Sequence, residues 1–98
     1  MLSGADLSSV NLEGADLRNA EIRQANLQGA NLSGADLRGT DFYGSNLCHV
    51  TARKALFIRA NLRETNLCGA DLRDSHLNDA NLVRASMHEA DLSSVHPG

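Results

Sequence analysis

The chain has few of the aromatic residues that often fill the core of a small globular protein and few of the cysteines that form disulfide bonds. Aromatic side chains make up 3% of its 98 residues, with no tryptophan, one proline and two cysteines. Two cysteines do not indicate a disulfide scaffold, and no run approaches the roughly 18 apolar residues of a membrane span. No charged segment followed by an apolar run indicates a secretory signal. These absences favour a small soluble protein, and the cytoplasm is its expected location.

What the chain does have is a period of five residues. From Leu2 to Leu92 every fifth residue is apolar, and only Ala52 among these centres is small. Successive centres would lie about 140° apart around an α-helix, and an odd period would alternate between the faces of a flat strand. The pattern therefore predicts short extended pieces, each followed by a turn, in a chain that coils and buries its centres by stacking coil on coil.

The other slots of the period agree with this interpretation. The residue two places before each centre is small or β-branched, as a narrow interior requires. Asp or Asn usually comes directly before the centre, where its side chain stabilises a turn, and glycine is frequent two places after it. The slots other than the centre and the small residue are expected to face water.

Segments such as Ala-Asp-Leu at 5–7 and 15–17 and Ala-Asn-Leu at 25–27 resemble the pentapeptide repeat family, and the resemblance covers almost the whole chain. It implies an all-β fold: a right-handed, four-sided parallel β-helix with four pentapeptides per coil. Residues twenty apart then stack, and the chain makes about five coils, each about 4.8 Å high. With no linker or low-complexity segment, residues 1–98 are expected to form a single domain.

Charge bears on the function that this resemblance implies. Some pentapeptide repeat proteins mimic duplex DNA and occupy the DNA site of a type II topoisomerase such as gyrase. DNA carries one charge per about 1.7 Å, so a rod of about 24 Å would need roughly fourteen net negative charges. This chain has a net charge of −3, and its acidic residues alternate with arginines. We therefore expect a non-enzymatic structural or protein-interaction module of unknown partner, with DNA mimicry as the alternative. No face is basic, which argues against direct nucleic-acid binding.

Cysteine and histidine residues form the only cluster in the sequence that could bind a metal ion or react. Cys48 and Cys68 lie twenty residues apart in the same slot, and His88 lies twenty further on. An exposed ladder of this kind offers three nearly collinear ligands, whereas zinc takes four in a tetrahedron. The three are weak metal candidates, and two ordinary solvent-facing thiols are the simpler interpretation. Redox chemistry stays open, and no catalytic residue or cofactor is expected.

The segment 51–58 departs from the pattern. Asp and Asn disappear, and Leu56 and Ile58 occupy outward slots. Ala52 is offset by two large residues of the same coil, Phe42 and Phe57, which keeps the interior filled. Leu56 and Ile58, joined by Tyr43 around the corner, form a candidate interaction patch. The alternative is that they are scattered apolar surface residues, which are normal.

The ends of the stack are a second candidate surface. A solenoid exposes its core at each terminus unless something covers it. The expected end contacts are Leu2, Leu7, Met87 and Leu92. They predict association of the ends with each other or with another pentapeptide repeat protein, unless the chain is part of a longer array.

Overall fold

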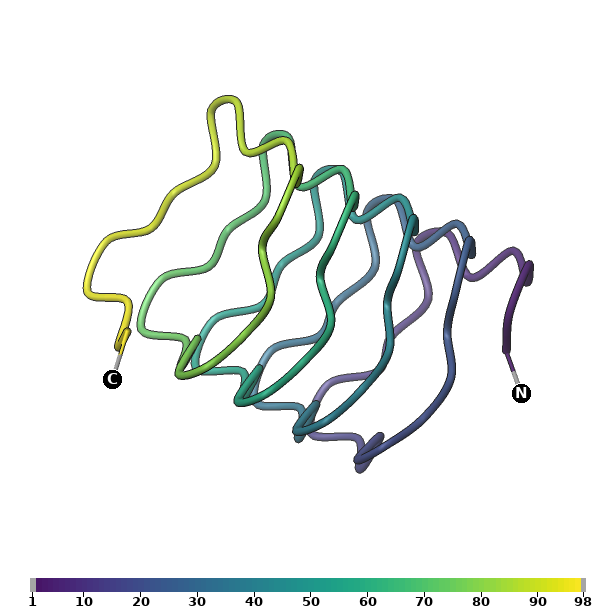
Figure 1. Cartoon of the computed structure of the whole chain (residues 1–98), viewed down its shortest axis with the longest axis horizontal. Coiled ribbons are helices and arrows are strands. Elements are labelled where there is room, and N and C mark those ends of the chain that lie inside the picture. The colour runs from purple at the N-terminus through teal and green to yellow at the C-terminus, as the bar shows by residue number, and fades with distance from the viewer. Residues whose placement is uncertain (1, 98) are drawn as a thin grey trace.

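The computed structural model describes residues 2–97, which wind as stacked coils around one axis (Figure 1). The first and last described residues lie at opposite ends of the stack. Each side of a coil contributes one bridged residue and a two-residue turn, and residues 2–97 contain neither a helix nor a longer strand. The principal extents of 30 × 25 × 24 Å describe a short prism. The predicted right-handed, four-sided β-helix is confirmed.

Parallel bridges join each bridged residue to the residue twenty positions later, from Asp6 with Asn26 to His76 with His96. The predicted stacking register is therefore confirmed. We name each face by one central residue. The Ile22 face also holds Leu2, Phe42, Leu62 and Leu82; the Leu27 face holds Leu7, Leu47, Leu67 and Met87; the Leu32 face holds Leu12, Ala52, Leu72 and Leu92; and the Leu37 face holds Leu17, Phe57 and Leu77.

Backbone hydrogen bonds connect the coils at every side. In the repeat 26–30, the N–H of Asn26 donates to a carbonyl of the preceding coil at 2.9 Å. The N–H groups of Leu27 and Gly29 donate to carbonyls of the following coil at 2.8 and 2.9 Å. The N–H of Ala30 closes the turn on the carbonyl of Leu27 at 2.9 Å. Of the five backbone N–H groups in this repeat, only that of Gln28 lacks a backbone acceptor.

The Asp or Asn side chain before the centre binds the remaining donor. The N–H of Gln28 donates to Oδ1 of Asn26 at 3.1 Å. The same bond, from the N–H two residues further on, is made by every aspartate and asparagine in this slot: Asp6, Asn11, Asp16, Asn26, Asn31, Asp36, Asp41, Asn46, Asn61, Asn66, Asp71, Asn81 and Asp91. The predicted turn-stabilising role of these residues is confirmed.

The residue two places after each centre has a positive φ in every turn. Glycines there have φ between 67° and 74°, and the other residues have φ between 55° and 64°. At Gly69 an added Cβ would also lie 2.4 Å from Nδ1 of His49 on the preceding coil, so a larger residue here would have to displace the His49 side chain. The expectation of unusual dihedrals in this slot is confirmed.

The interior is filled layer by layer. Phe42 and Phe57 are fully buried with ring centroids 6.3 Å apart, and Ala52 of the same coil is also fully buried. Four hydroxyl residues in the small slot are buried, and each donates to the carbonyl of a central residue: Thr40, Ser45, Thr65 and Ser75. These four buried hydroxyl groups are thus hydrogen-bonded, whereas the buried Nε of Arg63 has no hydrogen-bond partner among the described residues. The large and small centres share one layer.

Burial declines toward both ends of the stack. Leu2 is 36% exposed and Leu92 is 42% exposed, whereas Leu7 and Met87 are half-buried. Of the four predicted end contacts, only the outer two therefore present much apolar surface.

Candidate interaction surface

One band of surface combines unpaired positive charge with apolar side chains. We call it the 53–59 band, and it consists of Arg53, Lys54, Leu56, Ile58 and Arg59. Arg53 and Lys54 form the turn at one corner, Leu56 is the bridged residue of the Leu37 face, and Ile58 and Arg59 form the turn at the next corner. The band therefore spans one complete side of the coil, around the buried Phe57.

Most arginines of the chain are neutralised by acidic residues of the chain itself. Arg18, Arg38 and Arg73 each bind both carboxylate oxygens of the aspartate two residues earlier, at 2.6–2.9 Å. The hydrogen bonds from Arg18 lower the pKa of Asp16 to about 2. Arg23 pairs with Asp41, and Arg63 and Arg84 pair with Glu64. Each of these six guanidinium groups thus has a carboxylate within 4 Å, and Arg63 and Arg84 share the same one.

The cations of the 53–59 band differ. Within residues 2–97, neither Arg53, Lys54 nor Arg59 has a carboxylate within 4 Å of its charged nitrogens. The sequence explains why Arg53 has no partner of the kind that Arg18 has. The residue two places before it is Thr51 rather than aspartate. The sequence analysis did not single out these three residues, and the missing aspartate was a signal for Arg53 alone, since Lys54 and Arg59 occupy a different slot.

Leu56 changes the backbone as well as the surface of the band. It stands in the slot where Asp or Asn binds the N–H two residues further on, and it has no acceptor to offer. Throughout the described chain, the N–H of Ile58 has no hydrogen-bond acceptor. The N–H of Arg53, which also follows a slot without Asp or Asn, instead donates to Ser33 Oγ at 3.3 Å. Leu56 and Ile58 themselves are half-buried.

Shallow hollows flank the band at its two corners. One, of about 530 Å³, has Arg53 and Lys54 on one side and glycines on the other; it is lined by Glu13, Gly14, Ser33, Gly34, Thr51, Arg53 and Lys54. The second, of about 220 Å³, is lined by Arg18, Asn19, Arg38 and Arg59. The unpaired cations thus border concave surface into which a partner's side chains can reach.

Tyr43 lies on the Ile22 face, at the corner next to that of Ile58 and in the same slot as Arg63 of the following coil. The guanidinium of Arg23 lies 4.8 Å from its ring centroid, and its hydroxyl donates to Glu64 at 3.2 Å. Tyr43 is therefore held by side chains of its own face, and we do not include it in the 53–59 band.

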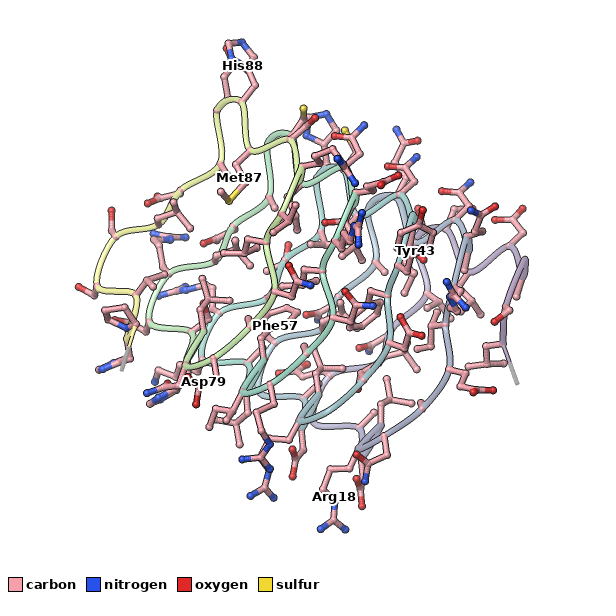
Figure 2. The ribbon with its side chains drawn as sticks, viewed as in Figure 1. Arg18, Tyr43, Phe57, Asp79, Met87 and His88 are labelled. Atoms are coloured by element: carbon pink, nitrogen blue, oxygen red, sulfur yellow. The ribbon has the colours of Figure 1, made fainter. Side chains whose placement is uncertain are left out.

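The predicted ladder keeps its backbone register, and the exposure of its side chains varies along the stack. Cys48 and Cys68 are free and half-buried rather than fully exposed. The His88 side chain is 84% exposed and points away from the coils (Figure 2). Within residues 2–97, no group of three or more His, Cys, Asp or Glu side chains is placed to hold a metal ion. The structure therefore does not bring His88 to the two thiols.

The repeat model for "Pentapeptide repeats" matches residues 2–39, 18–51 and 55–93, with eight copies. The chain belongs to the pentapeptide repeat family. A comparison with curated proteins gives no significant match. None of the residues 2–97 lies in a helix long and apolar enough to cross a membrane.

Solved pentapeptide repeat structures resemble the chain over nearly all of its length. HetL, described as involved in regulation of heterocyst differentiation in the cyanobacterium Nostoc, is 32% identical, with a TM-score of 0.79; the match covers 95% of this chain and 47% of HetL. A protein of the Arabidopsis thaliana thylakoid lumen is also 32% identical, with a TM-score of 0.71, and the match covers 96% of this chain and 62% of that protein. This chain therefore spans half to three fifths of the length of these relatives.

QnrB1, described as a plasmid-mediated fluoroquinolone resistance protein, also matches. The identity is 19% and the TM-score 0.41, over 100% of this chain and 64% of QnrB1. This likeness reflects the shared repeat and supports no assignment of function.

Proposed function

We propose that this pentapeptide repeat protein is a non-enzymatic interaction module whose 53–59 band binds an acidic segment of a partner protein. Members of the family are generally structural or interaction modules. The observation that carries the proposal is that Arg53, Lys54 and Arg59 have no ion-pair partner in the described chain, while the arginines around them do.

The chemistry of the band indicates the kind of partner. Carboxylates of the partner would neutralise the three cations, and charge complementarity of this sort fixes orientation and speeds association. Apolar side chains of the partner would cover Leu56 and Ile58, and a partner carbonyl would satisfy the free N–H of Ile58. An extended segment with alternating acidic and apolar residues meets all three requirements.

Displayed random peptides provide a direct test. We expect the protein to enrich peptides rich in Asp and Glu together with Leu or Ile, and the enriched peptides to bind more weakly as salt is raised. R53Q/K54Q/R59Q should weaken binding by about tenfold, since exposed charge pairs contribute about 0.2–1 kcal/mol each. The matched control is R23Q/R63Q/R84Q, which removes the same charge from the Ile22 face.

Two outcomes would overturn this proposal. One is enrichment of peptides without an excess of acidic residues. The other is equal weakening by the band variant and by its control, which would mean that net charge rather than the band recruits the peptides.

DNA mimicry toward gyrase remains the alternative and has less support. Asp16, Asp36 and Asp71 are each neutralised by a bidentate arginine, which removes much of the field that a DNA mimic needs. We expect no inhibition of gyrase supercoiling at low micromolar protein. Potent, salt-sensitive inhibition would replace the interaction-module proposal with the alternative.

A cytoplasmic location stays a prediction, because one similar protein is located in the thylakoid lumen. Fractionation of cells that produce the native full-length protein would test it.

A further inference from the structure

The Leu27 face holds two thiols that the interaction role does not use. Cys48 and Cys68 follow the centres of neighbouring coils in the same slot, and both are free and half-buried. The backbones that carry them are equivalent. The N–H of each cysteine donates to the preceding Asn side chain at 3.0 Å, and those asparagines, Asn46 and Asn66, are joined by a parallel bridge. The two Cα–Cβ bonds therefore point the same way, one coil apart.

This arrangement is poorly suited to a disulfide. Neighbouring parallel strands lie about 4.8 Å apart, whereas the two sulfurs of a disulfide are about 2.05 Å apart and the Cβ–S–S–Cβ dihedral is near 90°. Parallel Cβ directions would have to turn toward each other within a coil stack whose backbone is bound on both sides. Closing the bond therefore strains the stack.

The same spacing suits two collinear metal–thiolate bonds. A zinc–thiolate bond is about 2.3 Å long. Two metal–thiolate bonds of similar length in line would span about 4.6 Å, close to one coil height. Zinc would need further ligands, which the described residues do not supply at this position. A soft monovalent ion such as Cu(I) binds thiolates preferentially and is satisfied by two ligands in line.

We propose that Cys48 and Cys68 form a two-coordinate site for a soft monovalent metal ion, with Cu(I) as the ion of choice. Binding releases the two thiol protons and leaves a bis-thiolate complex of charge −1, with no oxidation or reduction. The neighbouring His49 lies over Gly69, the residue after Cys68, and its Nδ1 is 2.4 Å from the position that a Cβ at Gly69 would take. His49 thus covers the backbone beside the site from the preceding coil.

The periodicity of the chain allows a register test. Gln28 and Ser8 occupy the same slot one and two coils before Cys48. Q28C/C68S places two thiols one coil apart at 28 and 48, and S8C/C68S places them two coils apart, at about 9.6 Å. Each variant has two thiols in equivalent surface slots, so the pair differs chiefly in spacing.

The experiment is an anaerobic titration with Cu(I) in competition with a chromogenic chelator, together with native mass spectrometry. We expect one Cu(I) per wild-type chain. C48S and C68S should bind more than about 100-fold more weakly, since losing even an outer-shell partner of a metal ligand costs 10–100-fold. Q28C/C68S should restore binding and S8C/C68S should not.

Three results would overturn the proposed site. The first is equal Cu(I) affinity in the wild type and the single-thiol variants, and the second is restored Cu(I) affinity in S8C/C68S. The third is a metal ion held between two chains rather than within one. Circular dichroism of each variant confirms that the fold is intact. Because none of these variants changes the 53–59 band, failure of this site and failure of the interaction proposal are separate outcomes.

Discussion

The coil formed by residues 21–40 and the coil formed by residues 41–60 have the same backbone conformation and different side chains. Both have the same bridges to their neighbours and the same positive φ in every turn. Their centres differ: Ile22, Leu27, Leu32 and Leu37 in the first, and Phe42, Leu47, Ala52 and Phe57 in the second. Their surfaces differ at equivalent positions, where the Asp36–Arg38 ion pair of one corresponds to Leu56 and Ile58 of the other.

The comparison separates two kinds of departure from the repeat. An inward change is tolerated because another centre of the same layer compensates its volume. An outward change needs no such compensation, because backbone bonds and the buried layers hold the coil. Outward changes that leave charges unpaired are therefore the better indicators of a binding role.

The largest expected effect comes from removing a large centre of the second coil. Phe57→Ala leaves a cavity in a fully buried layer that already contains Ala52, and we expect it to destabilise the protein by about 3–5 kcal/mol. The equivalent Leu37→Ala in the first coil should cost about 2–5 kcal/mol. Chemical denaturation measures both, and a cost below about 1 kcal/mol for Phe57→Ala would mean that the layer collapses without a cavity.

Ala52→Leu tests whether the small Ala52 side chain makes room for Phe42 and Phe57, by adding volume to the layer instead of removing it. The added volume has no room beside Phe42 and Phe57, and we expect a loss of about 1–3 kcal/mol. A52L/F57L keeps the total number of side-chain carbons at the two positions and relieves part of the overpacking, so it should be more stable than the sum of its single variants indicates. Additive single effects in denaturant would contradict a shared layer.

The next largest loss of stability is expected from removing the hydrogen bond between an Asp or Asn side chain and the N–H of its turn. Asn46→Ala leaves the N–H of Cys48 without its acceptor, and we expect a loss of about 1 kcal/mol. Asn46→Asp keeps Oδ1 in place and serves as the control. If the two variants have equal unfolding midpoints, the side-chain acceptor does not contribute to stability.

The smallest expected effect is the acid dependence of the ion pairs. Arginine hydrogen bonds lower the pKa of Asp16 to about 2 and also lower the pKa values of Asp36 and Asp71 below 3.8. A lowered pKa contributes stability above the unfolded value, and that stability is lost as the pH falls from about 4 toward 2. The pairs are exposed, so salt should reduce the effect.

Denaturation midpoints at several pH values measure this dependence. D16N/D36N/D71N keeps each turn acceptor and removes the titrating groups, so its midpoint should change less between pH 5 and pH 2.5 than that of the wild type. An unchanged slope would show that these aspartates are not responsible for the acid sensitivity.

The sequence by itself determined the coil, its register and the filling of its layers. A strict period of five leaves no consistent buried face for a helix or a flat strand, and the resemblance to pentapeptide repeats supplied the four-sided winding. The role of the residue before each centre also followed from its chemistry, because Asp and Asn bind nearby backbone donors.

Only the tertiary structure decided which outward side chains have partners. Arg59 and Arg84 occupy the same kind of slot, and only the contacts between coils show that Arg84 pairs with Glu64 while Arg59 has no carboxylate within 4 Å among residues 2–97. The same holds for Cys48 and Cys68, which are half-buried although His88 in the same slot is exposed. A repeat fixes where each backbone position lies, whereas the contacts of a flexible surface side chain depend on the neighbours that the fold brings within its reach.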